Sequence, residues 1–358
     1  MEKEKKFLPK PLMKLITIIA YGTGIFFALM IVSGYWLSSP YTMPDPTSRF
    51  ISKETDGFIS INFDPDDPGF SEFCTSIAVK ILNAEKNSAV LMNMPSSFIQ
   101  FLESDEKDEN IKLFFPYEIG YLFSFKRNEE KPLKLIVVNF RYFKNFFKLF
   151  IKSLLQTKTK LIELGSENLR NPLRLFAARQ DNSHGGGEDD FLTFFESDMI
   201  YLTSEKFFKT SAESYFDNIA PYYEKPEVKN FYNKLVLSEN ISFVADNREY
   251  SLSRFIEFET KENISGVFFD IIDIIAGNID IKKDDIATGI VYIDLKKMYS
   301  EKRLQEEMIK LEVLTKENFN LNIDFEFGEI KEQNYYVLKF KCTGLTKLIV
   351  DGIGKRVS

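Results

Sequence analysis

The sequence has little of the chemistry on which enzymes most often rely. Its 358 residues include one histidine, two cysteines and one tryptophan. One histidine and two cysteines cannot supply the usual ligands of a zinc site. Neither a Gly-x-Ser-x-Gly elbow nor a phosphate-binding Gly-x-x-x-x-Gly-Lys-Ser/Thr loop occurs. We therefore predict no catalytic residue, no metal and no cofactor, and we interpret the chain as a protein that is not an enzyme.

The single histidine lies in the one stretch that looks like an active-site signature. His184 precedes three glycines in NSHGGGEDD, residues 182–190, much as in the oxyanion-hole loop of some lipases and esterases. That chemistry also needs a separate histidine as general base, and the acidic residues Glu188 and Asp189 would oppose an oxyanion. Glycines are tolerated in exposed turns, so we interpret the stretch as a hairpin loop.

The two cysteines leave one structural question open. Cys74 and Cys342 could form a single disulfide bond in an oxidising compartment. The alternative, which we favour, is that both are small buried apolar residues.

Charge is divided unevenly along the chain. Residues 1–14 carry five lysines against two glutamates, an excess of +3, so the remainder of a chain of net charge -7 carries -10. An acidic body lacks the basic face that neutralises phosphates. We therefore exclude nucleic acid as the main partner.

A long apolar run follows this basic tail. Residues 15–37 contain no charge over 23 positions, and about 20 apolar residues suffice to cross the hydrocarbon core of a bilayer. Tyr35, Trp36 and Tyr41 stand at its far end, where aromatic rings favour the membrane interface. The run is long and ends in bulky residues, so it predicts an uncleaved signal anchor in contact with membrane lipid instead of a cleaved signal peptide.

The charge bias sets the expected orientation. Lysines of residues 1–14 stay in the cytoplasm under the positive-inside rule, which places the chain beyond the anchor on the other side. In a bacterium this predicts a single-pass protein of the inner membrane with its main domain in the periplasm. Residues 38–56 contain three prolines among polar residues and read as a stalk.

Residues 57–358 alternate between strand and helix patterns. Strands are expected within 57–63, 89–94, 119–125, 133–140, 173–180, 191–204, 241–247, 277–281, 288–295, 321–330 and 335–342. Helices are expected over about 70–82, 141–156, 204–219, 226–237 and 296–318. Hairpins separated by helices predict an α+β domain with antiparallel sheets. Two related lobes, 57–225 and 226–358, are an alternative organisation of the same domain.

An acidic loop precedes the first of these helices. Its sequence, DPDDPG at residues 64–69, faintly resembles the start of a calcium-binding loop. Pro68 and Thr75 occupy positions where that loop needs ligands. We predict that its carboxylates cap the helix instead, because anions favour a helix N-terminus.

The helix expected at 141–156 is the most distinctive surface candidate. Four basic residues fall on one side of it: Arg141, Lys144, Lys148 and Lys152. Four phenylalanines fall on the opposite side: Phe143, Phe146, Phe147 and Phe150. Packing of the phenylalanines on a sheet is the simpler interpretation, and contact with a membrane or partner surface is the alternative.

Three functions remain open at this stage. The leading hypothesis is a non-enzymatic scaffold or accessory subunit of a cell-envelope complex, with other envelope proteins as partners and homo-oligomerisation as an open alternative. The second is an anchored binding protein for lipid or another apolar ligand, since the 36 phenylalanines could line a cavity. The third is a hydrolase of envelope polymers with paired carboxylates in a cleft.

Overall fold

The computed structural model describes residues 47–63, 67, 69–70, 72–77, 116–140, 161–164, 175–179, 191–195, 198–202, 204–216, 219–222, 224–260, 268–282, 285–319, 321–330 and 335–346. The basic tail 1–14, the apolar run 15–37, the helix expected at 141–156 and the loop 182–190 lie outside these residues. Within the described part, no helix is long and apolar enough to cross a membrane.

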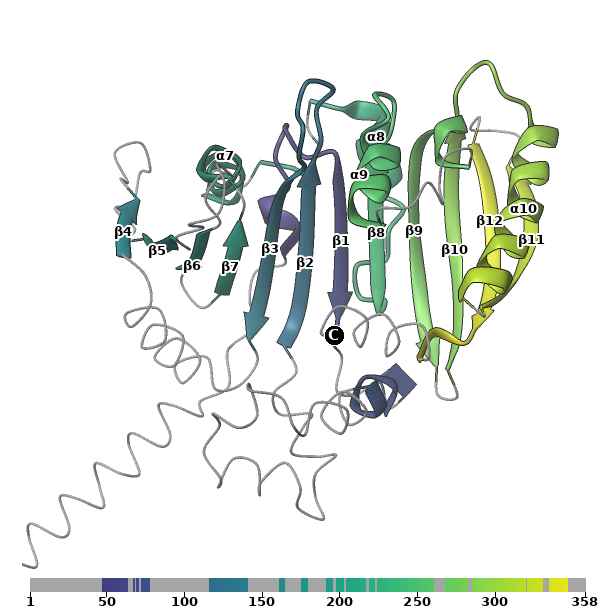
Figure 1. Cartoon of the computed structure of the whole chain (residues 1–358), viewed down its shortest axis with the longest axis horizontal. Helices are drawn as coiled ribbons and strands as arrows, with labels where there is room; N and C mark the ends of the chain where they lie inside the picture. Colours follow the sequence, from purple (N-terminus) through teal and green to yellow (C-terminus); the bar gives the residue numbers. More distant parts are fainter. Residues whose placement is uncertain are drawn as a thin grey trace, which may run out of the picture.

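The described strands form one broad antiparallel sheet. They are β1 (Gly57–Asn62), β2 (Pro116–Ser124), β3 (Leu133–Phe140), β4 (Leu161–Leu164), β5 (Leu175–Arg179), β6 (Phe191–Phe195), β7 (Asp198–Leu202), β8 (Ile241–Asp246), β9 (Ile272–Lys282), β10 (Ile286–Leu295), β11 (Asn322–Ile330) and β12 (Tyr335–Thr343). Their order is β11-β12-β10-β9-β8-β1-β2-β3-β7-β6-β5-β4, from right to left in Figure 1. The chain is therefore a mixed α+β protein dominated by an antiparallel sheet, as the repeated hairpins predict.

The two halves of the sheet share the order of five strands, and the first half has β5 and β4 in addition. In the first half β1 pairs with the hairpin β2–β3, and β7 of the hairpin β6–β7 then pairs with β3. In the second half β8 pairs with the hairpin β9–β10, and β12 of the hairpin β11–β12 then pairs with β10. The halves join where β1 pairs with β8, so they form one continuous sheet.

Helices cover both faces of this sheet. Neighbouring residues of a strand point to opposite faces, and Val244 and Ala245 on β8 belong to different hydrophobic clusters. The Val244 cluster contains residues of η1 (Thr47–Phe50), α7 (Glu205–Phe216) and α8 (Pro226–Tyr232). The Ala245 cluster contains residues of α9 (Ser251–Thr260), η2 (Phe269–Ile271) and α10 (Glu301–Phe319).

The helical residues 69–70 and 72–77 begin as the sequence predicts. Asp67 Oδ1 accepts hydrogen bonds from the backbone N–H groups of Gly69 at 3.0 Å and Phe70 at 3.3 Å. Asp67 Oδ2 accepts a third from the Asn240 amide at 2.9 Å. The capping role predicted for the acidic loop is confirmed for this carboxylate.

Several elements differ from the sequence-based expectation. The strand expected at 191–204 is two antiparallel strands, β6 and β7, in which Phe195 pairs with Asp198. The last helix begins at Glu301, later than expected. Helix α9 was not predicted at all, although its residues Phe255 and Ile256 contribute to the core.

Residues 47–56 are not a stalk. Thr47, Phe50, Ile51 and Asp56 are buried, and η1 packs against α7 and β2. Prolines and polar residues suggested an exposed linker, but the polar side chains here have buried hydrogen-bond partners in the sheet. A stalk would have to end before Thr47.

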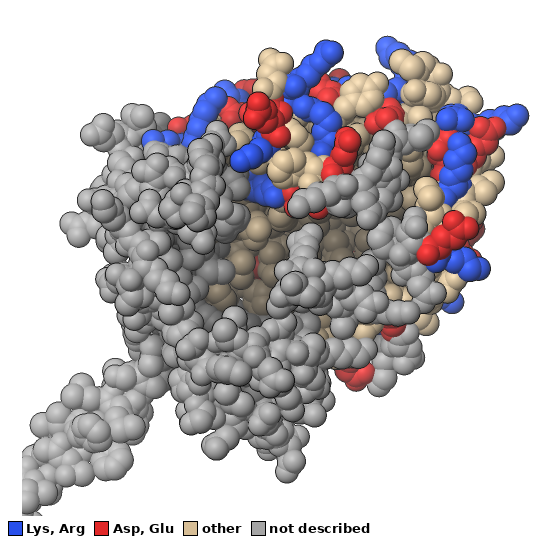
Figure 2. All heavy atoms as spheres, viewed as in Figure 1, with Lys and Arg blue, Asp and Glu red and all other residues tan. Residues whose placement is uncertain are grey.

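The described surface is charged and mixed in sign. In Figure 2, Lys and Arg are interspersed with Asp and Glu, with apolar and uncharged residues between them. At the edge strand β11, the exposed Asp324 and Glu326 lie opposite Lys341 and Lys339 of β12. Such cross-strand pairs of opposite charge suit a solvated surface.

Candidate functional site

The surface candidates from the sequence fall outside the described residues. This applies to Arg141, Lys144, Lys148 and Lys152, to Phe143, Phe146, Phe147 and Phe150, and to Tyr35, Trp36 and Tyr41. Only the two cysteines can be placed.

Both cysteines are free thiols in one hydrophobic cluster. Burial, followed by the charge of Asp67, raises the pKa of Cys74 to about 12. Burial, followed by the charge of Asp285, raises the pKa of Cys342 to about 11. Since the thiolate is the reactive form, both act as apolar packing residues at neutral pH.

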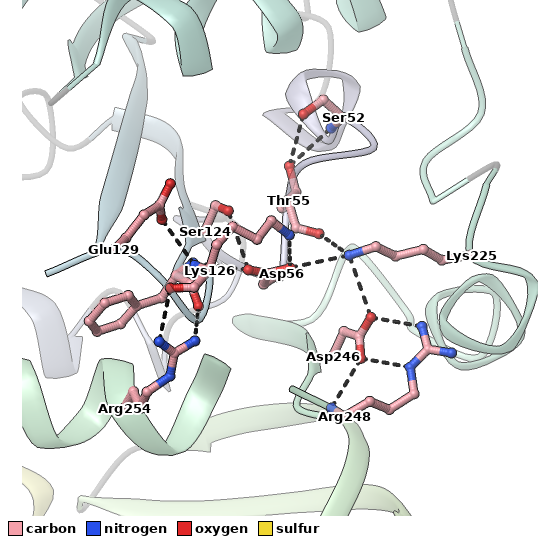
Figure 3. A network of polar contacts seen from close by, with 11 residues as sticks. Ser52, Thr55, Asp56, Ser124, Lys126, Glu129, Lys225, Asp246, Arg248 and Arg254 are labelled. Atoms are coloured by element: carbon pink, nitrogen blue, oxygen red, sulfur yellow. Dashed lines mark hydrogen bonds and ion pairs between the residues drawn. The ribbon is translucent and has the colours of Figure 1, made fainter. Parts of the chain in front are cut away.

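A network of buried charges joins the strands at the centre of the sheet (Figure 3). Asp56 directly precedes β1, and its side chain is only 4% exposed. Its carboxylate accepts hydrogen bonds from the Phe125 N–H at 2.9 Å, from Lys126 at 2.8 Å and from Lys225 at 3.2 Å. Neighbouring segments of β1, β2 and α8 are therefore tied to one carboxylate.

Asp246 at the end of β8 forms the second half of this network. Its two oxygens accept from Arg248 Nε at 2.9 Å and Arg248 Nη2 at 2.8 Å, a bidentate pair. Lys225 lies 3.4 Å away and bridges to Asp56. Burial raises the pKa of Asp246, but the Arg248 hydrogen bond and the Lys225 charge outweigh it, so the pKa is lowered overall.

These two carboxylates are fully engaged in structural contacts. Each accepts from at least one cation and from a backbone N–H. A general base needs an oxygen free to take a proton from a substrate. We therefore interpret the network as a clamp that fixes the loops around it.

Tyr222 lies beside this clamp and carries two unfavourable features. Its backbone φ of 56° is in the left-handed region, which is uncommon for a bulky residue and costs on the order of 1–3 kcal/mol. Its hydroxyl is buried and has no hydrogen-bond partner, which costs about 1–3 kcal/mol more. Burial and the charges of Asp56 and Asp246 raise the pKa of this phenol well above its ordinary value. Strained backbone conformations and buried polar groups without a hydrogen-bond partner are enriched at functional sites.

A cleft of about 570 Å³ adjoins Tyr222. Its described walls are residues 51–53 after η1, one face of α7, and four residues that follow this helix: Ile219, Ala220, Tyr222 and Glu224. The α7 wall consists of Thr210, Glu213 and Ser214, whose spacing of three and four places them on one side of the helix. The volume is within the range of about 300–1,000 Å³ typical of small-molecule sites.

The hydroxyl groups of the α7 wall are not arranged as nucleophiles. The Thr210 hydroxyl donates to the Lys206 carbonyl at 3.2 Å, and the Ser214 hydroxyl donates to the Thr210 carbonyl at 3.3 Å. A nucleophilic hydroxyl would instead donate to a general base. The described part of the cleft is therefore suited to binding, with these oxygens available as acceptors.

A further pair of carboxylates, Asp273 and Asp294, lies where β9 begins and β10 ends, close enough to the clamp for the Arg248 charge to act on both. Burial, followed by the charge of Asp273, raises the pKa of Asp294 to about 6. Burial also raises the pKa of Asp273. Neither residue is among those that line the cleft. Among the described residues, no three His, Cys, Asp or Glu side chains are grouped so that they could hold a metal ion.

Sequence reasoning did not find Tyr222 or the cleft. The residues around Tyr222 read APYYEK, in which Pro221 marks a turn, but nothing in that pattern shows which tyrosine is buried. The walls of the cleft come from segments about 160 residues apart along the chain. Only the folded arrangement brings them together.

Comparison with known proteins identifies no family. No family model matches the sequence, and no match is found among curated proteins. Among solved structures, crystal form III of TP0453 aligns with 86% of this chain and 99% of its own, at 8% identity and a TM-score of 0.43. Crystal form I of TP0453 covers 87% of this chain and 98% of its own, at 8% identity and a TM-score of 0.40. Function does not transfer at this level of similarity.

Proposed function

We propose that this protein is a membrane-anchored binding protein that holds a small, largely apolar ligand in the cleft beside Tyr222. The observation that carries the proposal is the buried, partnerless hydroxyl of Tyr222 on a residue with left-handed backbone. Stability alone does not explain these two features at one residue that also lines a cavity. The anchor is the apolar run 15–37, with the cleft on the periplasmic side.

The cleft favours binding over the other two hypotheses. A hydrolase with paired carboxylates needs an acid and a second carboxylate aimed at one bond. Glu213 and Glu224 both line the cleft, but both are exposed, and the buried Asp56 and Asp246 are engaged with cations. A purely scaffolding protein, in turn, has no need of a cavity with a strained residue in its wall.

A second candidate, the accessory subunit of an envelope complex, is favoured by the outer face of α10. Ile309 and Val313 lie one turn apart there and are 61% and 49% exposed. Exposed apolar side chains grouped on one helix mark a partner surface more often than isolated ones do. This helix lies at the end of the sheet beside β11 (Figure 1). None of the described residues that line the cleft belongs to it.

The deciding experiment is purification of the full-length protein from its native membrane in mild detergent. Mass spectrometry then identifies the lipids, small molecules and proteins that accompany it. The proposal expects a stoichiometric ligand with the wild type and with Val236→Trp, a control at an exposed site away from the cleft. Ala220→Trp, which fills the cleft, should lose that ligand.

Two other outcomes would change the conclusion. Retention of the ligand by Ala220→Trp would place its site elsewhere and refute the proposal. A stoichiometric protein partner that Ile309→Glu releases, with no ligand present, would establish the accessory-subunit function instead.

A further inference from the structure

The polar groups of the cleft are mostly hydrogen-bond acceptors. Thr210 and Ser214 commit their protons to backbone carbonyls of α7, so each offers lone pairs to the cleft. Glu213 and Glu224 add two carboxylates. When ionised, these groups accept hydrogen bonds and donate none. Lys53 is the one cationic side chain among the described lining residues.

The position of α7 strengthens this polarity. Glu213 and Ser214 belong to the last turn of the helix, where backbone carbonyls without helical partners carry partial negative charge. That turn contains no basic residue. The Ile219 N–H satisfies one of these carbonyls, that of Ser214, at 3.2 Å. The carbonyl end of the helix therefore faces the same region as the two carboxylates.

The remaining lining is apolar. Ile51 and Tyr222 are buried, while Ile219 is 44% exposed and Ala220 is also exposed. A ligand that fills this space gains from removing apolar surface from water. Its polar end would meet acceptors and negative charge, so the complementary group is a donor with positive charge.

We propose that the cleft selects a ligand that joins an apolar body to a protonated amine. The amine lies beside Glu213 and Glu224 at the carbonyl end of α7, and the apolar part lies against Ile51 and Ile219. This inference rests on the proposed function, because it names the chemical class of the ligand held in the same cleft.

The test compares three probes that share one alkyl chain: octylamine, octanol and octanoate. Each is titrated calorimetrically into the full-length protein in detergent, below its own micelle concentration and near neutral pH. Partly exposed ion pairs contribute up to about 1 kcal/mol each, so octylamine should bind about tenfold more tightly than octanoate. The preference should weaken as salt is added.

Variants separate charge from shape. The double variant Glu213→Gln with Glu224→Gln should lose about tenfold in octylamine affinity and leave octanol binding unchanged. Glu317→Gln, an exposed position on α10, is the matched control and should change neither. Lys53→Met should not weaken octylamine binding.

The outcomes distinguish this inference from the proposed function. Octanoate binding equal to or tighter than octylamine binding overturns the inference, as does failure of all three probes to bind. In either case the binding function stands if Ala220→Trp still loses the ligand that accompanies the wild type. It falls only if that variant keeps the ligand.

Discussion

Titration of Asp294 should make the stability of the protein depend on pH. Its pKa in the folded protein is about 6, above the ordinary value of 3.8, so between about pH 4 and pH 6 the folded chain binds a proton that the unfolded chain has released. The free energy of unfolding therefore falls as pH rises through this window. We expect Asp294→Asn to raise the melting temperature at pH 7 and to change it little at pH 4.

Thermal unfolding at a series of pH values between 4 and 7 measures this effect. Asp324→Asn, at an exposed position on β11, keeps Asp294, so its melting temperature should keep the pH dependence of the wild type. An equal shift for Asp294→Asn at pH 4 and pH 7 would mean that the side chain acts through packing and not through its charge.

Lys225 is the residue that connects the two buried carboxylates of the clamp. It donates to the Thr55 carbonyl at 3.0 Å as well as to Asp56, and its side chain is 17% exposed. Lys225→Met leaves each carboxylate with one cation, so we expect a loss of about 2 kcal/mol in the free energy of unfolding. Urea denaturation measures this loss, with the exposed Lys302→Met as control. A smaller loss in free energy of unfolding for Lys225→Met than for Lys302→Met would contradict the stabilising role of the clamp.

Sequence reasoning at the residue scale succeeded where the signal was local. Asp67 was predicted to cap because its carboxylate stands a few residues before an apolar helical pattern. Glu307 carries no such local signal: its side chain is 2% exposed and lies 2.7 Å from both Arg303 and Lys310. Burial of a single charge depends on which side of α10 faces the sheet, and Glu307 adjoins the apolar side of the helix, next to Met308 and one turn from Leu304.

Among the elements, η1 depends on a glycine in β2. A Cβ at Gly120 would lie 2.3 Å from Thr47 Oγ1, while Thr47 is held by hydrogen bonds of 2.9 Å and 2.6 Å to the buried Glu118 carboxylate. Neither side can move freely. We expect Gly120→Ala to cost about 1–3 kcal/mol in the free energy of unfolding.

A double-mutant cycle tests this contact. Thr47→Gly removes the atoms that would clash, so the second substitution should cost less in that background than in the wild type. Additive costs, measured by chemical denaturation, would show that η1 and β2 tolerate the extra methyl group independently.

Element prediction followed the strength of the local pattern. The hairpins β2–β3 and β11–β12 were predicted because each pairs two alternating runs across a short polar segment. Helix α9 was missed because its sequence, SLSRFIEFET, is short and bears phenylalanines that also suit strands. The run 191–204 was read as one strand because Glu196 and Ser197 do not include the glycine or proline that usually marks a turn.

At the scale of the whole molecule, the domain begins earlier than its first strand. Phe50 and Ile51 are each 1% exposed, and burial of such side chains contributes roughly 1.5–3 kcal/mol apiece. We expect a chain that begins at residue 47 to unfold cooperatively. One that begins at residue 57 also loses Asp56 and should be unfolded or strongly destabilised, because the net stability of a domain is only about 5–15 kcal/mol.

Circular dichroism during heating compares the two truncated chains. Equal melting temperatures would restore the interpretation of residues 47–56 as a stalk.

The cleft itself could not be predicted at any scale from sequence, since residues 51–53, α7 and residues 219–224 each look ordinary alone. Their meeting depends on the order of strands across the entire sheet.

The pairing of β1 with β8 has a consequence for how the chain folds during its synthesis. β1 is the first of the described strands to be synthesised, yet one of its two neighbours, β8, begins at Ile241. Until that strand arrives, one edge of β1 has no partner, and open strand edges invite pairing with other chains. Pairings this distant along the chain also close slowly. The central strand of the finished protein is thus the most vulnerable part of the nascent one, and a chaperone that shields it would act between the synthesis of β1 and that of β8.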